Sequence, residues 1–229
     1  MAVMRRLVPT LTAALLAVAP VAGCASTTDG VAKANPAHTA KPLGSVDLDS
    51  IFLTPSQLSE IVGAPLALRL DQNRPAGGGS GGPCSPVDTA GADSFVGNGF
   101  QAFHVLVLAD GKGEEHDHVV TQSAAVYPDA PAAGKQFASV TGGLAPCDGR
   151  QLRGDAAWKF AINDVTPESV RWNKEQTDVS LLWVCYGQGR VRNNVIVEAM
   201  VCRGDDAGAQ NVDTILDRMS AAIWELSGA

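Results

Sequence analysis

The sequence has few basic residues for its length. Lys and Arg number 17 against 24 Asp and Glu, so the formal net charge of the 229-residue chain is −7. A chain this acidic offers no broad positive field to phosphates or anionic head groups. It also lacks a basic run interleaved with aromatic residues, so we expect no nucleic-acid binding.

Aromatic residues are scarce as well, at 5% of the chain, while hydrophobic residues make up 45% and charged residues 18%. This composition, with 24 Gly and 13 Pro, is typical of one soluble globular domain with flexible additions. The few tryptophans therefore become informative.

The N-terminus has the layout of a secretory signal. Arg5 and Arg6 precede a mostly apolar stretch over 7–21 that is too short to span a bilayer stably. Val21-Ala22-Gly23-Cys24 then resembles the bacterial lipobox, in which the peptidase cuts before the cysteine and its sulfur carries diacylglycerol. We predict a signal peptide over 1–23 and a membrane anchor at Cys24, on the extracytoplasmic face of the cell membrane. The alternative is an ordinary signal peptide with a chance cysteine.

Residues 24–46 have no apolar period and many small or helix-breaking residues. We interpret them as the lipidated cysteine and a disordered stalk. Cleavage before Cys24 removes two arginines and no acid, leaving 15 basic against 24 acidic residues. The folded domain is then expected over 47–229.

The stretch from Cys185 to Cys202 predicts a disulfide-closed hairpin. Asn193-Asn194 lies midway and suits a two-residue type I′ turn. With that turn, Cys185 and Cys202 face each other as a non-hydrogen-bonded pair, at a distance that a disulfide accepts. A longer or bulged hairpin at Gly187 and Gly189 is the alternative. With Cys24 lipidated, elimination pairs Cys84 with Cys147.

This cysteine spacing, with RNNVIVEA before the last cysteine, resembles the PknH-like extracellular sensor domain, over about residues 47–229. That domain is the outer part of a transmembrane Ser/Thr kinase in the founding members, and the family includes stand-alone lipoproteins. The family tends to carry Trp where this chain has Leu144. The chain has none of the kinase motifs: no Gly-rich loop with a strand lysine, no HRD and no DFG.

Local patterns place helices near the ends and strands in the middle. Thr54-Pro55-Ser56-Gln57 is a helix start that Gly63 ends, and apolar residues line one face of 211–224. We predict an α+β fold, an antiparallel sheet with helices packed mainly on one face and two disulfides; the resemblance adds a cleft. The expected helices are 54–63, 130–140 and 211–224, and the expected strands are 99–110, 118–128, 156–164, 169–175 and the two arms of the 185–202 hairpin.

Two short motifs are weak candidates for chemistry. Gly78-Gly79-Ser80-Gly81-Gly82 matches GxSxG but lies between prolines rather than between a strand and a helix. His116 and His118 within EEHDH, with His104 nearby, would suit zinc, but mixed charges after a turn favour a solvated loop. We therefore predict no metal and no cofactor.

The candidate ligand site rests on three tryptophans and one arginine. Trp158 and Trp172 lie on neighbouring expected strands beside Lys159, Arg171 and Lys174, and Trp183 precedes the glycine-thinned strand. An aromatic floor with basic neighbours would suit an anionic or sugar-bearing envelope ligand. The predicted ligand-binding residues are Trp158, Trp172, Trp183 and Arg171; core packing is the alternative.

We therefore expect a membrane-anchored extracytoplasmic lipoprotein with a sensor-like, non-catalytic domain that binds an unknown small molecule or envelope component. An alternative is a structural or carrier lipoprotein acting through envelope-protein or lipid contacts. A secreted hydrolase is the third possibility.

Overall fold

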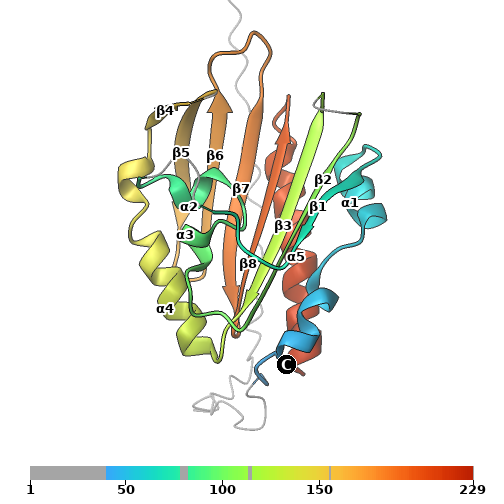
Figure 1. Cartoon of the computed structure of the whole chain (residues 1–229), viewed down its shortest axis with the longest axis vertical. Helices are drawn as coiled ribbons and strands as arrows, with labels where there is room; N and C mark the ends of the chain where they lie inside the picture. The colour runs from blue at the N-terminus through green and yellow to red at the C-terminus, as the bar shows by residue number, and fades with distance from the viewer. Residues whose placement is uncertain (1–39, 78–81, 113–114, 155, 229) are drawn as a thin grey trace, which may run out of the picture. The chain divides into compact units, whose positions relative to one another are not determined.

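The computed structural model describes residues 40–228 apart from 78–81, 113–114 and 155. The predicted signal peptide, Cys24 and most of the predicted stalk lie outside these residues, as does most of the GxSxG stretch. In the described part, one antiparallel sheet of eight strands runs in the order β1-β2-β3-β8-β7-β6-β5-β4 (Figure 1). The strands are β1 Ala67–Gln72, β2 Ala102–Ala109, β3 His118–Val126, β4 Gln151–Arg153, β5 Ala157–Val165, β6 Ser169–Gln176, β7 Val184–Arg192 and β8 Val195–Arg203.

Helices cover both faces of this sheet. One face packs against η1, α1 and α5, and the other against α2, α3 and α4, forming two separate apolar clusters. The helical segments are η1 Ser45–Ile51, α1 Pro55–Val62, α2 Ser85–Asp88, α3 Asp93–Val96, α4 Ala130–Thr141, η2 Ala145–Cys147 and α5 Gly208–Ser227.

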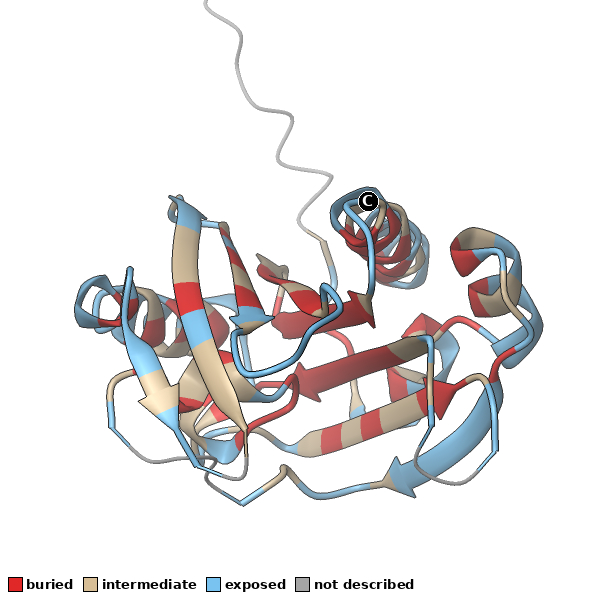
Figure 2. Ribbon diagram, turned by 90° about the horizontal axis from the view of Figure 1, so that it is seen from above, coloured by how far each residue is buried: buried red, intermediate tan, exposed pale blue. Residues whose placement is uncertain are grey.

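The α+β class and the antiparallel sheet are confirmed, but the helices do not lie mainly on one face. The reason is the central strand β8, which is buried from Val195 to Cys202. Val197 belongs to the cluster under α5, whereas its neighbour Ile196 belongs to the cluster on the opposite face. A strand that is apolar on both sides needs cover on both sides. Figure 2 shows this burial concentrated in the central strands, while β1 at the edge is exposed.

The predicted local signals appear where the sequence placed them. The Thr54 side chain accepts a hydrogen bond from the backbone N–H of Gln57, and Gly63 closes α1 at φ 78°. In α5, the buried residues Val212, Ile215 and Leu216 continue the apolar stripe toward Ile223. These helices form because caps and apolar spacing agree.

The β7–β8 hairpin has the predicted register, with Arg192 opposite Val195 and Cys185 opposite Cys202. Cys185–Cys202 and Cys84–Cys147 are the two disulfides of the described residues, as predicted. The turn differs in type, because Asn193 has φ 51° but Asn194 does not share a positive φ. Type I′ requires positive φ at both positions.

The Asn194 side chain ties the turn to the N-terminal segment. Its Oδ1 accepts from the Leu43 backbone N–H at 2.8 Å, and its Nδ2 donates to the carbonyls of Leu43 and Tyr127 at 2.9 and 2.6 Å. Leu43 is itself buried. The folded part therefore begins before residue 47, the boundary expected from composition, because a buried asparagine holds 41–46 in place.

The described chain also starts and ends at this pole of the sheet. The Lys41 backbone N–H donates to the Ser227 carbonyl at 3.0 Å, and Asn193 Nδ2 donates to the Lys41 carbonyl at 2.8 Å. The β2–β3 and β6–β7 loops lie at the opposite pole (Figure 1).

Candidate functional site

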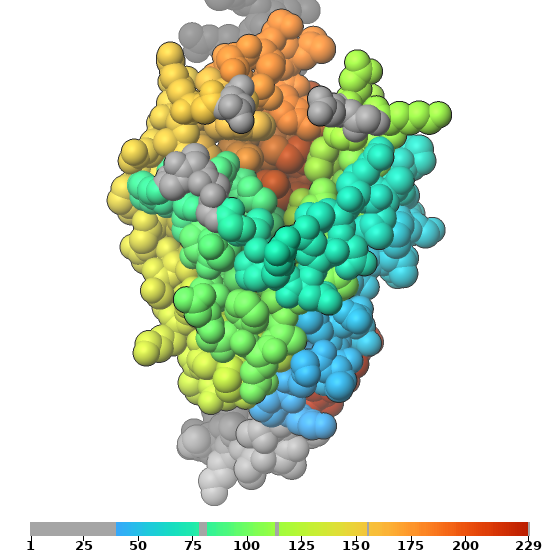
Figure 3. All heavy atoms as spheres, in the orientation of Figure 1, coloured from blue at the N-terminus to red at the C-terminus, as the bar shows by residue number. Residues whose placement is uncertain are grey.

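A large hollow lies at the pole opposite the β7–β8 turn. It has a volume of about 1080 Å³ and is lined by three segments: 116–118 at the start of β3, 176–183 after β6, and Gly204 and Asp205 after β8. These segments meet because His118 and Val184 both pair with Arg203 in the sheet register. In Figure 3 the surface is hollowed between the orange β6–β7 loop and the yellow-green β2–β3 loop.

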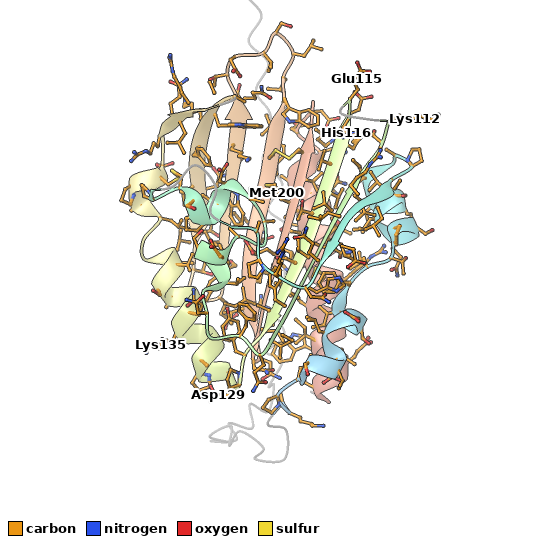
Figure 4. The ribbon with its side chains drawn as sticks, in the orientation of Figure 1. Lys112, Glu115, His116, Asp129, Lys135 and Met200 are labelled. Atoms are coloured by element: carbon orange, nitrogen blue, oxygen red, sulfur yellow. A yellow bond between two sulfur atoms is a disulfide. The ribbon has the colours of Figure 1, made fainter. Side chains whose placement is uncertain are left out.

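One wall of the hollow carries two histidines oriented by Asp110. His118 Nδ1 lies 2.7 Å from Asp110 Oδ2, and His116 Nδ1 lies 2.8 Å from the Asp110 carbonyl oxygen. Burial raises the pKa of Asp110, but hydrogen bonds from the His118 ring and from the backbone N–H groups of His118 and Asp117 outweigh this, so its pKa is lowered overall. Figure 4 shows His116 and Glu115 near the tip of the β2–β3 hairpin, whereas Met200 lies nearer the middle of the sheet.

Three aspartates add negative charge around the hollow. A hydrogen bond from Arg203 lowers the pKa of Asp205, and one from the Ala157 backbone N–H lowers that of Asp178. Asp117 is exposed beside them. Among the described residues that line this hollow there is no Lys or Arg. The wall is therefore acidic at neutral pH.

The opposite wall is the β6–β7 loop, whose apolar side chains project into solvent. Leu181 is 81% exposed, Leu182 51% and Val179 44%. Trp183 closes the loop, since its carbonyl accepts from the Gln176 backbone N–H at 2.9 Å. The hollow thus places apolar and acidic surfaces side by side.

The four predicted ligand residues do not form one site. Trp183 lines the large hollow, and Trp158 lines a smaller one of about 310 Å³ with Asp88 and Leu152. Both tryptophans pack against the cluster that contains Cys185, Met200 and Cys202. A ligand-binding role for these two remains a prediction.

Trp172 lies in the core. Its side chain is 1% exposed and packs 6.0 Å, centroid to centroid, from the ring of Phe95. A Cβ at Gly187, its partner on β7, would lie 2.2 Å from the Trp172 ring. The Trp172 ring therefore occupies the space that Gly187 leaves on that face. Trp172 and Arg171, two of the predicted ligand residues, still line one small hollow of about 140 Å³ together with Gly187 and Asp213.

Two of the three basic residues expected to orient an anion, Lys174 and Arg171, are paired within the molecule. Lys174 Nζ donates to the backbone carbonyl of Asp88, lies 3.0 Å from its Oδ1, and sits 4.5 Å from the Trp158 ring centroid. Arg171 points to the other face of the sheet, where its Nη2 lies 2.6 Å from Asp213 Oδ1 of α5. Because Lys174 and Arg171 already contact carboxylates of the protein, an anionic ligand would have to compete with Asp88 and Asp213 for them.

Sequence reasoning missed a buried acid, Glu198 of β8, whose side chain is 0% exposed. Its Oε2 accepts from the Gly91 backbone N–H at 2.9 Å and from Ser123 Oγ at 3.2 Å, while Oε1 has no partner within the described residues. Burial raises the pKa of Glu198 to about 8. The signal was a single acid within the apolar run VIVEAMV.

The described residues give no metal cluster and no membrane span. Nowhere in them do three or more His, Cys, Asp or Glu side chains converge as metal ligands would. His104 does not join His116 and His118; its ring nitrogens lie 2.9 Å from Asp49 Oδ1 and 2.8 Å from Asp71 Oδ1. None of the helices in this part of the chain is long and apolar enough to cross a bilayer.

Comparison with known proteins gives one family and one fold. The model of the PknH-like extracellular domain family matches residues 43–221. The crystal structure of the extracellular domain of PknH from Mycobacterium tuberculosis superposes with a TM-score of 0.72 at 18% identity, over 82% of this chain and 100% of that one. No curated protein matches the chain significantly.

Proposed function

Because the chain belongs to the PknH-like extracellular domain family, we propose that it is an extracytoplasmic lipoprotein, anchored at Cys24, whose domain binds a ligand and catalyses no reaction. The family supports the extracytoplasmic, sensor-like part of this proposal. The N-terminal signal and lipobox support the anchor. We propose that a bound ligand is carried, scavenged or presented to another protein.

The observation that carries ligand binding is the hollow beside Trp183. Binding sites are typically concave, with apolar walls and a few convergent polar groups. Here the β6–β7 loop provides the apolar wall, and His116, His118 and the aspartates provide the polar one. The first described residues, at Lys41, lie at the opposite pole of the domain from this hollow.

Native mass spectrometry of the protein purified from its own envelope tests the proposal. We expect a bound species in the wild type that is lost in Trp183→Ala. Trp158→Ala is the matched control, because Trp158 flanks the same disulfide but lines a different hollow. A ligand retained by Trp183→Ala and lost from Trp158→Ala would move the site to the smaller hollow, and no ligand in any sample would argue against binding.

A further inference from the structure

The β6–β7 loop forms an apolar patch at the rim of the hollow. Val179, Leu181 and Leu182 lie within four consecutive positions and are all more than 40% exposed. The other exposed large apolar side chains of the described residues are spread over η1, β1, β5 and α5. A single exposed leucine is ordinary on a protein surface, but a local group beside a concavity marks an interaction surface.

The charge of the facing wall indicates what the patch would accept. Asp117, Asp178 and Asp205 line the hollow, and no lysine or arginine lines it within the part of the chain that the structure describes. Of these, Asp205 already binds Arg203, at 2.8 Å from Nη2, whereas the side chain of Asp117 is exposed. An anionic occupant would be repelled at this wall, and a cation would be attracted.

The shape of the hollow favours a protein segment over a small molecule. Small-ligand sites bury about 70–90% of the ligand surface. This hollow opens outward between two loops (Figure 3), and Leu181 projects from its rim at 81% exposure. Such a rim suits contact with a larger surface.

We propose that the hollow receives a segment of another protein that carries apolar side chains flanked by Lys or Arg. The apolar side chains pack on Leu181, Leu182 and Trp183, and the basic groups lie against Asp117 and Asp178. This inference rests on the proposed function and names the partner class for the same site.

Three synthetic peptides test the proposal. They share the same leucines and carry lysine, glutamine or glutamate at the remaining positions. The full chain is reconstituted in nanodiscs of zwitterionic lipid, and empty nanodiscs provide the reference signal. We expect the Leu/Lys peptide to bind at least ten times more tightly than the Leu/Glu peptide, with Leu/Gln between them and a preference that shrinks at high salt.

Variants locate the binding surface. Replacing both loop leucines (Leu181→Ser with Leu182→Ser) should weaken Leu/Lys binding at least tenfold. The matched control is Leu68→Ser with Val165→Ser, two side chains 48% and 49% exposed on other elements, which should leave binding unchanged. Asp117→Asn should weaken Leu/Lys binding a few-fold and leave Leu/Gln binding unchanged.

Several outcomes would overturn the inference. Equal affinity for the Leu/Lys and Leu/Glu peptides would show that the aspartates do not select a basic partner. Wild-type affinity in the Leu181→Ser/Leu182→Ser variant would show that the apolar patch does not contact the peptide. Leucine-dependent self-association in sedimentation would make a second copy of this chain the occupant. Tighter binding of monomeric short-chain phosphatidylcholine than of the Leu/Lys peptide would make it a lipid. In that last case the proposed ligand-binding function stands while this inference falls.

Discussion

Two glycines of β7 leave room for aromatic rings rather than for a ligand. A Cβ at Gly187 would lie 2.2 Å from Trp172, and one at Gly189 would lie 2.5 Å from Phe95. Both rings belong to the apolar cluster under α3 and α4. The missing side chains therefore admit the largest core residues onto the sheet.

Gly187→Ala should consequently destabilise the domain. The Trp172 ring is rigid and almost fully buried, so the added methyl forces it or β7 to shift, at a cost of about 1–3 kcal/mol. Thermal melts measure the effect. Gly134→Ala, in α4 with nothing within 4 Å of the new Cβ, is the control and should be neutral or slightly stabilising. Equal melting of both variants would contradict the packing described.

Glu198 makes stability depend on pH. Its folded pKa of about 8 lies above the ordinary value of 4.5 because the carboxyl is buried. The stability that Glu198 contributes is therefore fully present below pH 4.5, where its carboxyl is neutral in the folded and in the unfolded chain. It is lost between pH 4.5 and about 8, where the carboxyl ionises in the unfolded chain but stays neutral in the folded one. The expected slope in that window is up to about 1.4 kcal/mol per pH unit.

Glu198→Gln should flatten this dependence, since an amide keeps an acceptor for Gly91 but does not ionise. Denaturant unfolding at pH 5 and pH 8 measures the difference between the two proteins. Glu225→Gln, at an exposed position of α5, should leave the slope unchanged. If the unfolding free energy of Glu198→Gln changes with pH as steeply as that of the wild type, the pH dependence arises from other groups.

At the scale of elements, signals between near neighbours were predictable. Thr54 and Gly63 bound α1, and the Asn193-Asn194 turn fixed the register that joins Cys185 to Cys202. The edge strand β1 was missed because it is exposed along almost its whole length and shows no apolar alternation. Burial on both faces of β8 did not reveal which helix would cover which face.

Trp172 shows why the candidate site could not be predicted as well as the fold. The polar neighbours that suggested an accessible site, Arg171 and Asn173, point to the opposite face of β6, because successive strand residues alternate. Val170 and Trp172 share the buried face. The apolar patch of Val179, Leu181 and Leu182 lies in the β6–β7 loop. In a loop the spacing of apolar residues in the sequence does not indicate which of them are exposed.

Asn194 is the link between the hairpin turn and the N-terminal segment. Asn194→Ala would leave the Leu43 N–H and the carbonyls of Leu43 and Tyr127 without these side-chain bonds in a buried site, at a cost of about 2–4 kcal/mol. Faster amide exchange at Leu43 would report release of the segment.

The matched control is Asn193→Gly, since glycine tolerates the φ of 51° and loses only the bond to Lys41. That variant should change stability by less than about 1 kcal/mol. If Leu43 exchanges equally fast in both variants, the segment is held by its apolar contacts instead.

At the scale of the whole molecule, the predicted anchor can be separated from the fold. The described domain starts at residue 40, well after Cys24. Cys24→Ala should therefore reduce the share of protein in the membrane fraction, because acyl chains provide about 0.8 kcal/mol of membrane affinity per buried CH₂. Wild-type partitioning of the variant would exclude the lipid anchor.

The same variant should keep the two disulfides, whose four cysteines all lie within the described domain, and the thermal stability of that domain. Non-reduced peptide mapping and melts check this. Loss of either disulfide would indicate that anchoring and folding are coupled.

The meeting of Lys41 with Ser227 has a consequence for how the domain can be rebuilt. Because the backbone at these two positions is joined by a hydrogen bond of 3.0 Å, a short linker could close the chain there, and new ends could be opened elsewhere. Circular permutation is tolerated best at exposed loop tips, and the β2–β3 loop is such a place: Gly111 and Lys112 are exposed. A permutant opened there would present its new termini beside the hollow, where a fused reporter would sense its occupation.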